Sequence, residues 1–153
     1  MNTSENLPRV VVGVDGSPAS YEALRWAARH ARLIGGKVDA VAAYDLPGAG
    51  GWSAPVADAT FDAEMASRSL SEELGTALTG TGTDDVPLEQ HVVRGNPAEV
   101  LTEAASGAEL LVVGNRGRGG FASLLLGSVS QQCALHAPCP VVIVRAEETD
   151  KRK

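Results

Sequence analysis

Short apolar runs alternate along this chain with longer segments in which apolar residues recur every three or four positions. Continuous runs rich in Val, Ile and Leu are typical of strands buried on both faces of a parallel sheet. The runs predict strands at Arg9–Val14, Val38–Tyr44, Leu88–Arg94, Glu109–Gly114 and Pro140–Arg145. The periodic segments between them predict helices at Pro18–Ile34, Thr60–Leu78, Ala98–Ala105 and Ser128–His136. Strands that alternate with helices indicate an α/β fold of right-handed βαβ units, with helices on both faces of a parallel sheet.

Local signals support several of these boundaries. Ser17 is a good N-cap and Pro18 suits the first helical position, while Gly35 and Gly36 end the first helix. Asn96 and Pro97 repeat the cap-and-proline signal before the third helix. In the second helix we expect five apolar side chains to reach the core: Phe61, Met65, Leu70, Leu74 and Leu78.

Composition fits a single domain with an aliphatic core. The chain has 153 residues, of which 44% are hydrophobic but only 4% aromatic, so Val, Leu, Ile and Ala must fill the core. We expect one domain over residues 9–146, a flexible N-terminus over residues 1–8 and a charged tail over residues 147–153.

Charge and cysteine usage narrow the function classes. A net charge of -6 argues against a general binder of nucleic acid or anionic membranes. Cys133 and Cys139 form no CxxC pair and no cluster with histidine, which argues against structural zinc. The start of the chain does not have the pattern of a signal peptide, and no apolar stretch approaches the ~20 residues that span a membrane. These features predict a soluble, cytoplasmic protein.

Ligands of open parallel sheets bind beyond the carboxyl ends of the strands. The segment after the fourth predicted strand is the most informative, because Gly114, Gly117, Gly127 and Ser128 form a G-x2-G-x9-G-S pattern. Glycines let the backbone approach a phosphate closely, and the start of the following helix favours an anion. Arg116 adds positive charge. The pattern predicts a site for a triphosphate; the alternative is a glycine-rich loop that merely turns the chain.

The sequence resembles the universal stress protein family, whose ATP-binding members carry G-x2-G-x9-G-[S/T] at this place. The resemblance extends over nearly the whole chain. It rests also on Val-Val-Val-Gly-Val-Asp-Gly-Ser near the start, on the strand Val38–Tyr44, on Arg94-Gly95-Asn96-Pro97, on Leu-Val-Val-Gly before Asn115, and on His-Ala-Pro-Cys-Pro-Val-Val near the end. It implies a single-domain, Rossmann-like fold of the adenine nucleotide α-hydrolase type, with five parallel strands in the order 3-2-1-4-5.

The same resemblance implies which residues bind ATP. Asp15 would accept hydrogen bonds from the ribose hydroxyls, with Val14 beside it, and Ala43 would contact adenine through its backbone. The ribose and phosphates would be held by both ends of the glycine motif: Gly114, Arg116, Gly117, Gly127, Ser128, Val129 and Ser130. Asp15 has an alternative role as a turn residue that bonds its own backbone. Arg116 has an alternative as a solvated loop charge.

Other nucleotide and signalling classes do not fit. A phosphorylatable receiver domain needs an Asp at the end of the third strand, where this chain has Val93-Arg94-Gly95. The chain lacks G-x4-G-K-[ST], a G-x-G-x-x-G after the first strand, and the Ser-Gly-Gly-x-Asp-Ser loop of adenylating relatives. No general base or carboxylate pair is evident, so we expect a non-enzymatic ATP binder with at most slow hydrolysis. Mg²⁺ could accompany the phosphates. The alternative is a structural or partner-binding module with a vestigial pocket.

The last predicted strand raises the question of assembly. Val141–Val144 is strongly apolar and lies at the expected sheet edge, which needs a cover or a partner. The resemblance implies a homodimer in which this strand pairs with its copy across a two-fold axis. The alternative is a monomer in which the charged tail folds back over the edge.

Overall fold

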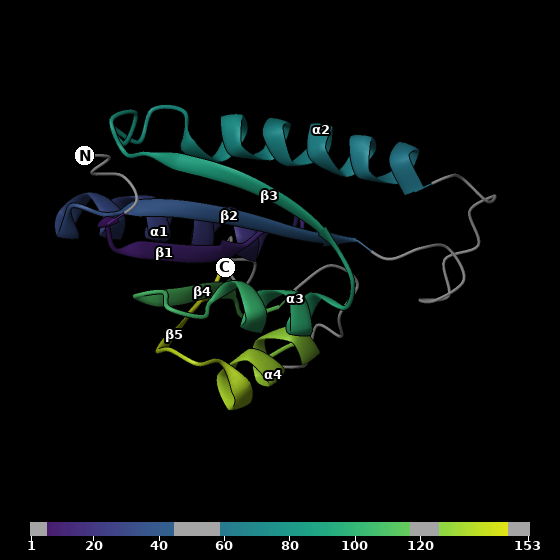
Figure 1. Ribbon diagram of the computed structural model, residues 1–153. Helices are drawn as coiled ribbons and strands as arrows, with labels where there is room; N and C mark the ends of the chain where they lie inside the picture. Colours follow the sequence, from purple (N-terminus) through teal and green to yellow (C-terminus); the bar gives the residue numbers. More distant parts are fainter. Residues whose placement is uncertain (1–5, 45–58, 117–125, 147–153) are drawn as a thin grey trace, which may run out of the picture.

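A computed structural model of the protein describes residues 6–44, 59–116 and 126–146 (Figure 1). Its strands form one parallel sheet in the order β3-β2-β1-β4-β5, which confirms the predicted order. The strands are β1 (Arg9–Gly13), β2 (Lys37–Tyr44), β3 (Leu88–Arg94), β4 (Leu110–Gly114) and β5 (Val141–Val144). The helices are α1 (Pro18–Ile34), α2 (Ala59–Leu78), α3 (Pro97–Ala104) and α4 (Ser128–His136).

The central strand β1 is covered on every side. It pairs with β2 through Val10↔Val38 and with β4 through Val10↔Leu110, so both of its edges are hydrogen-bonded. Val10, Val11 and Val12 are completely buried. The segment Val10–Val12 contains no polar residue because side chains on both faces of β1 pack against a layer of helices.

Alternate residues of the strands build two separate cores, one on each face of the sheet. Helices α1 and α2 cover one face and α3 and α4 the other (Figure 1). The first core contains Val10, Val12, Val38, Ala40, Leu24, Leu70, Leu74 and Val112. The second contains Val11, Val41, Val100, Leu101, Leu111, Val113 and Cys133. This three-layer arrangement leaves the carboxyl ends of the strands open to a ligand.

The capping signals predicted at the start of α1 and α3 and at the end of α1 are confirmed, although α3 spans Pro97–Ala104, one residue earlier than predicted. Ser17 Oγ accepts a hydrogen bond from Ser20 N at 3.2 Å, and Gly35 ends α1 with a left-handed φ of 68°. Asn96 Oδ1 accepts from Ala98 N at 3.0 Å and from Glu99 N at 3.2 Å. Both helices therefore start directly beyond a strand end and are held there by a side chain.

One core assignment on α2 was wrong. Leu70 and Leu74 are buried as predicted, but Met65 is 50% exposed. The reason is angular: the five-residue step from Met65 to Leu70 turns the helix by about 140° beyond a full turn, so the two side chains leave different faces. The side chain of Phe61 lies outside the described residues.

Several expectations fall on parts of the chain that the structure does not describe. These include most of the predicted N-terminal segment, the charged tail over residues 147–153, and Gly117 of the glycine motif. The proposed domain limits therefore stay predictions. A search of the described helices finds none with the length and hydropathy needed to cross a membrane. A cytoplasmic location likewise stays a prediction.

Candidate functional site

An open pocket lies at the carboxyl ends of β1, β2 and β4. Strands β1 and β4 are neighbours in the sheet, and the chain leaves them toward opposite faces, with α1 on one and α4 on the other. This is the switch point at which sheets of this class bind their ligands.

Most of the site residues proposed from the sequence meet in this pocket. Its lining includes Val14, Asp15, Ala43, Gly114, Arg116, Val129 and Ser130. Ser128 is next to the lining residue Val129 and Gly127 precedes it, but neither is part of the lining, and Gly117 lies outside the described residues. The structure thus brings segments from four distant parts of the chain together.

Asp15 performs the turn function that was the alternative to ligand binding. Its Oδ1 accepts hydrogen bonds from Ser17 N at 2.9 Å and from Ser17 Oγ at 2.6 Å. Gly16 between them has a φ of 82°, which suits glycine. Among the described residues no donor reaches Oδ2, and the side chain is exposed at the pocket. One oxygen therefore holds the turn while the other is available to a ligand.

Two pocket serines were missed from the sequence. Ser17 and Ser20 are buried, lie in the first turn of α1 and line the pocket. Ser20 Oγ accepts from Asp15 N at 3.3 Å, so both hydroxyls brace the turn that presents Asp15. The capping signal at Ser17 was visible, but its place beside the end of β4 depends on the packing of α1 against that strand.

Gly114, the first glycine of the motif, is required by packing. A Cβ at this position would lie 2.6 Å from Ala19 Cβ and 2.8 Å from Ala19 C. Gly114 is not among the glycines with positive φ, so backbone conformation does not require it. Its missing side chain lets the start of α1 lie directly against the end of β4, and this contact forms one wall of the pocket.

The start of α4 is fastened to the end of β4 by the buried Asn115. The carbonyl of Asn115 accepts from Gly127 N at 2.7 Å and from Ser130 Oγ at 3.0 Å. Ser130 Oγ is also 3.0 Å from Gly127 O, so this buried hydroxyl already has main-chain acceptors. Gly127, the N-cap, makes no side-chain hydrogen bond to the helix. The first amides of α4 lack the side-chain acceptor that Ser17 and Asn96 give to α1 and α3.

The described lining of the pocket contains few ionisable side chains. Asp15 is the one acidic residue in the described lining, which includes no histidine. The free thiol of Cys133 is fully buried, and burial raises its pKa to about 11. Burial also raises the pKa of Cys139, an effect that Arg9 partly offsets. Neither cysteine is part of the described lining of the pocket.

Comparison with known proteins gives a consistent result. The sequence model of the Universal stress protein family matches residues 6–145. A universal stress protein from Mycolicibacterium smegmatis is 40% identical over 144 residues, covering 89% of this chain and 45% of that protein. The chain thus spans about half the length of that relative. A universal stress protein of Thermus aquaticus is 36% identical over 146 residues and is covered over 97% of its length.

A solved structure agrees with the sequence comparison. A crystal structure of a universal stress protein in complex with cAMP superposes on this fold with a TM-score of 0.64 and 29% sequence identity. The match covers 92% of this chain and 98% of that one.

Proposed function

This chain belongs to the universal stress protein family, and from that premise we propose that it is a stress-response protein that binds ATP in the strand-end pocket. The observation that carries the proposal is the pocket itself, which gathers Asp15, Ala43, Gly114 and the start of α4 at the switch point of the sheet. The related protein that was solved with cAMP supports an adenine nucleotide as the ligand class.

The described groups suit the parts of a nucleotide in different ways. Asp15 Oδ2 is available to accept hydrogen bonds from the ribose hydroxyls, and Val14 lies beside it. The backbone of Ala43, at the end of β2, is suited to adenine. For the phosphates we propose the backbone at Gly114, Gly117, Gly127, Ser128, Val129 and Ser130, together with the guanidinium of Arg116. Free amides at a helix start are well suited to phosphate oxygens.

The proposal is one of binding, with at most slow hydrolysis. A general base for an attacking water and a pair of carboxylates for two metal ions are both missing from the described lining. Mg²⁺ keeps several waters and is often held through substrate phosphates, so the ion could accompany ATP with few protein ligands. The bound nucleotide would then act by changing the conformation or the partners of the protein.

One observation favours the second candidate, a partner-binding module with a vestigial pocket. Asp15 Oδ1 and Ser130 Oγ are both engaged in internal hydrogen bonds, which a purely structural strand end would also show. The two candidates differ in whether the purified protein binds a nucleotide at all.

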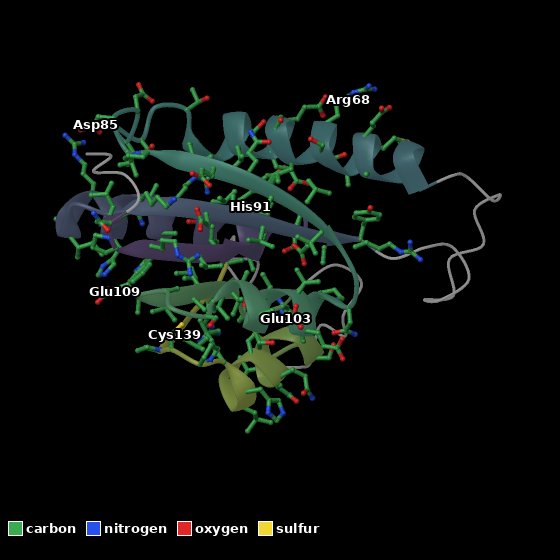
Figure 2. The ribbon with its side chains drawn as sticks, in the orientation of Figure 1. Arg68, Asp85, His91, Glu103, Glu109 and Cys139 are labelled. Carbon is green, nitrogen blue, oxygen red and sulfur yellow. The ribbon has the colours of Figure 1, made fainter. Side chains whose placement is uncertain are left out.

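Calorimetric titration of the purified chain with ATP, and separately with cAMP, tests the proposal. We expect saturable binding of ATP and a loss of roughly 10- to 150-fold in affinity for Asp15→Ala, because a hydrogen bond to a charged group contributes about 1.5–3 kcal/mol. Asp85→Ala is the matched control, since Asp85 is an exposed carboxylate outside the described pocket lining, 3.9 Å from Arg32 (Figure 2). Equal ATP affinity for wild type and Asp15→Ala, with cooperative unfolding in both, would return Asp15 to its turn function alone.

We also propose a homodimer formed through β5. This strand is at one edge of the sheet, and its four apolar residues, Val141–Val144, are each only partly buried. An apolar edge strand of this kind favours pairing with another strand. Two copies that meet antiparallel across a two-fold axis would extend the sheet from one subunit into the other.

A further inference from the structure

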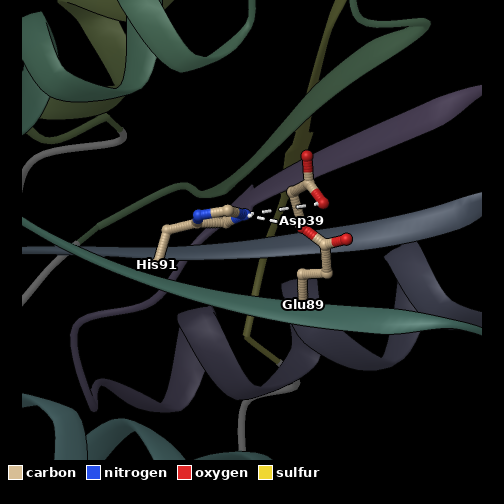
Figure 3. A group of neighbouring side chains, drawn as sticks. All are labelled: Asp39, Glu89 and His91. Atoms are coloured by element: carbon tan, nitrogen blue, oxygen red, sulfur yellow. Dashed lines mark ion pairs between the residues drawn. The ribbon is translucent and has the colours of Figure 1, made fainter. Parts of the chain in front are cut away.

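Three polar side chains meet on the sheet at its other edge, where β2 pairs with β3 (Figure 3). Asp39 is on β2, while Glu89 and His91 are on β3. Asp39 is the register partner of Glu89, and Glu89 and His91 are two residues apart, so all three side chains leave the same face of the sheet. None of them belongs to the described lining of the nucleotide pocket.

Asp39 is an unusual residue at the centre of this group. Its side chain is 8% exposed, and its Oδ2 accepts a hydrogen bond from Arg9 at 2.9 Å. Its Oδ1 is buried and has no hydrogen-bond partner among the described residues. Two side-chain nitrogens, His91 Nε2 at 3.7 Å and Lys37 Nζ at 3.9 Å from Oδ1, are too far for a hydrogen bond. A buried carboxylate oxygen without a donor is costly, and such an oxygen indicates a missing partner.

The two distances from the imidazole to the carboxylates are close to those between ligands of one metal ion. Two ligands bound at ~2.1 Å to one tetrahedral ion are about 3.4 Å apart. His91 Nε2 is 3.4 Å from Glu89 Oε1 and 3.7 Å from Asp39 Oδ1, and one ligand atom from each residue lies within 4.8 Å of the others. Figure 3 shows the imidazole directed at both carboxylates, with the three groups arranged around a common point.

We propose that Asp39, Glu89 and His91 form a binding site for a divalent transition-metal ion of the Zn²⁺ type. One imidazole and two carboxylates are a donor set that Zn²⁺ accepts, and a water would complete a four-coordinate shell. Glu89 and His91 are 58% and 43% exposed, so an ion can enter from solvent. The ion would supply the partner that Asp39 Oδ1 lacks and would tie edge strand β3 to β2.

Lys37 is the competitor for this site. Its Nζ is 3.2 Å from Glu89 Oε2 and 3.9 Å from Asp39 Oδ1, so it already balances part of the negative charge. An ion-pair network that holds no metal would contain the same contacts. A metal site and an ion-pair network can be distinguished, because only a metal site predicts that removing the Lys37 ammonium strengthens the binding of a cation.

The test is calorimetric titration of metal-free, nucleotide-free protein with Zn²⁺. We expect one ion per chain, and at least a tenfold loss of affinity for His91→Gln and for Glu89→Gln, two exposed positions whose replacement leaves both cores intact. His136→Gln is the matched control, because His136 is on α4, outside this group. In the same protein, the ¹⁵N resonance of His91 Nε2 should shift on addition of Zn²⁺ while that of His136 does not.

Lys37→Met provides a second, opposite change. The Lys37→Met variant should bind Zn²⁺ more tightly than wild type, because the competing ammonium charge is removed while Asp39, Glu89 and His91 remain. Wild-type protein that binds no Zn²⁺, or binding that is unchanged in both His91→Gln and Lys37→Met, would overturn the proposal and leave an ion-pair network at this edge.

Discussion

Replacing Gly114 with alanine tests whether close packing, and not the backbone conformation, requires a glycine at the end of β4. The new Cβ would lie 2.6 Å from Ala19 Cβ and 2.8 Å from Ala19 C, whereas carbon atoms in contact are normally ~3.5–4.0 Å apart. Both clashing atoms are fixed to the backbone of α1, so no side-chain rotation relieves the contact. The helix and the strand must separate by about 1 Å, and overpacking of this kind costs about 1–3 kcal/mol.

The chain offers a control for the same substitution. Gly75 is exposed near the end of α2, and a Cβ there would meet no heavy atom within 4 Å. Alanine is favoured over glycine within a helix by about 0.5–1 kcal/mol, so Gly75→Ala should stabilise the protein. The same substitution, glycine to alanine, is therefore predicted to destabilise the protein at position 114 and to stabilise it at position 75.

Thermal unfolding followed by circular dichroism measures both effects. At roughly 2–4 °C per kcal/mol for a chain of this length, the thermal midpoints of the two variants should differ from that of wild type by a few degrees in opposite directions. Because Gly114 also lines the pocket, Gly114→Ala should weaken ATP binding as well. Equal stability of Gly114→Ala and wild type, or stabilisation similar to that of Gly75→Ala, would refute the packing argument.

Two further predictions concern assembly and the buried thiol. Light scattering at micromolar concentration should show a wild-type dimer that Ile143→Lys converts to a monomer with ATP binding retained; a monomeric wild type would contradict pairing through β5. Cys133, with a pKa of about 11, is ~0.1% thiolate at pH 8, so iodoacetamide should label it far more slowly in the folded protein than in urea. The folded state holds this proton more tightly than the unfolded chain, so the stability it contributes is present below about pH 9 and is lost as the pH rises through 11.

The strands and their order were predictable because each inner strand has a simple environment. The run Val10–Val12 is apolar at every position since β1 has helices on both faces and a strand on each edge. The caps at Ser17 and Asn96 were predictable because a side-chain acceptor three residues or fewer before an amide is a local feature. Met65 shows the limit of this approach, since an apolar residue on a helix is buried only where its angle matches the covered stripe.

The pocket was predictable in outline, because strand ends of a parallel sheet converge whatever the side chains are. This reasoning placed Asp15, Ala43 and Gly114 together. Sequence reasoning could not show that both hydrogen bonds form, from Ser17 to Asp15 Oδ1 and from Ser130 Oγ to the carbonyl of Asn115, because each depends on the exact position of the side chains in the folded protein. The group around Asp39 was missed for the same reason. Its one local signal was a carboxylate inside the apolar run of β2, between Val38 and Ala40.

The position of β1 at the centre of the sheet has a consequence for synthesis on the ribosome. Its neighbour β2 follows after one helix, but its other neighbour, β4, is translated only after β2, α2, β3 and α3. At about 5–20 residues per second, β1, whose Val10, Val11 and Val12 are fully buried in the folded protein, waits several seconds with one edge unpaired. An edge of this kind invites pairing with other nascent chains. The interval between the emergence of β2 and that of β4 is therefore the period in which this edge of β1 is open to such pairing.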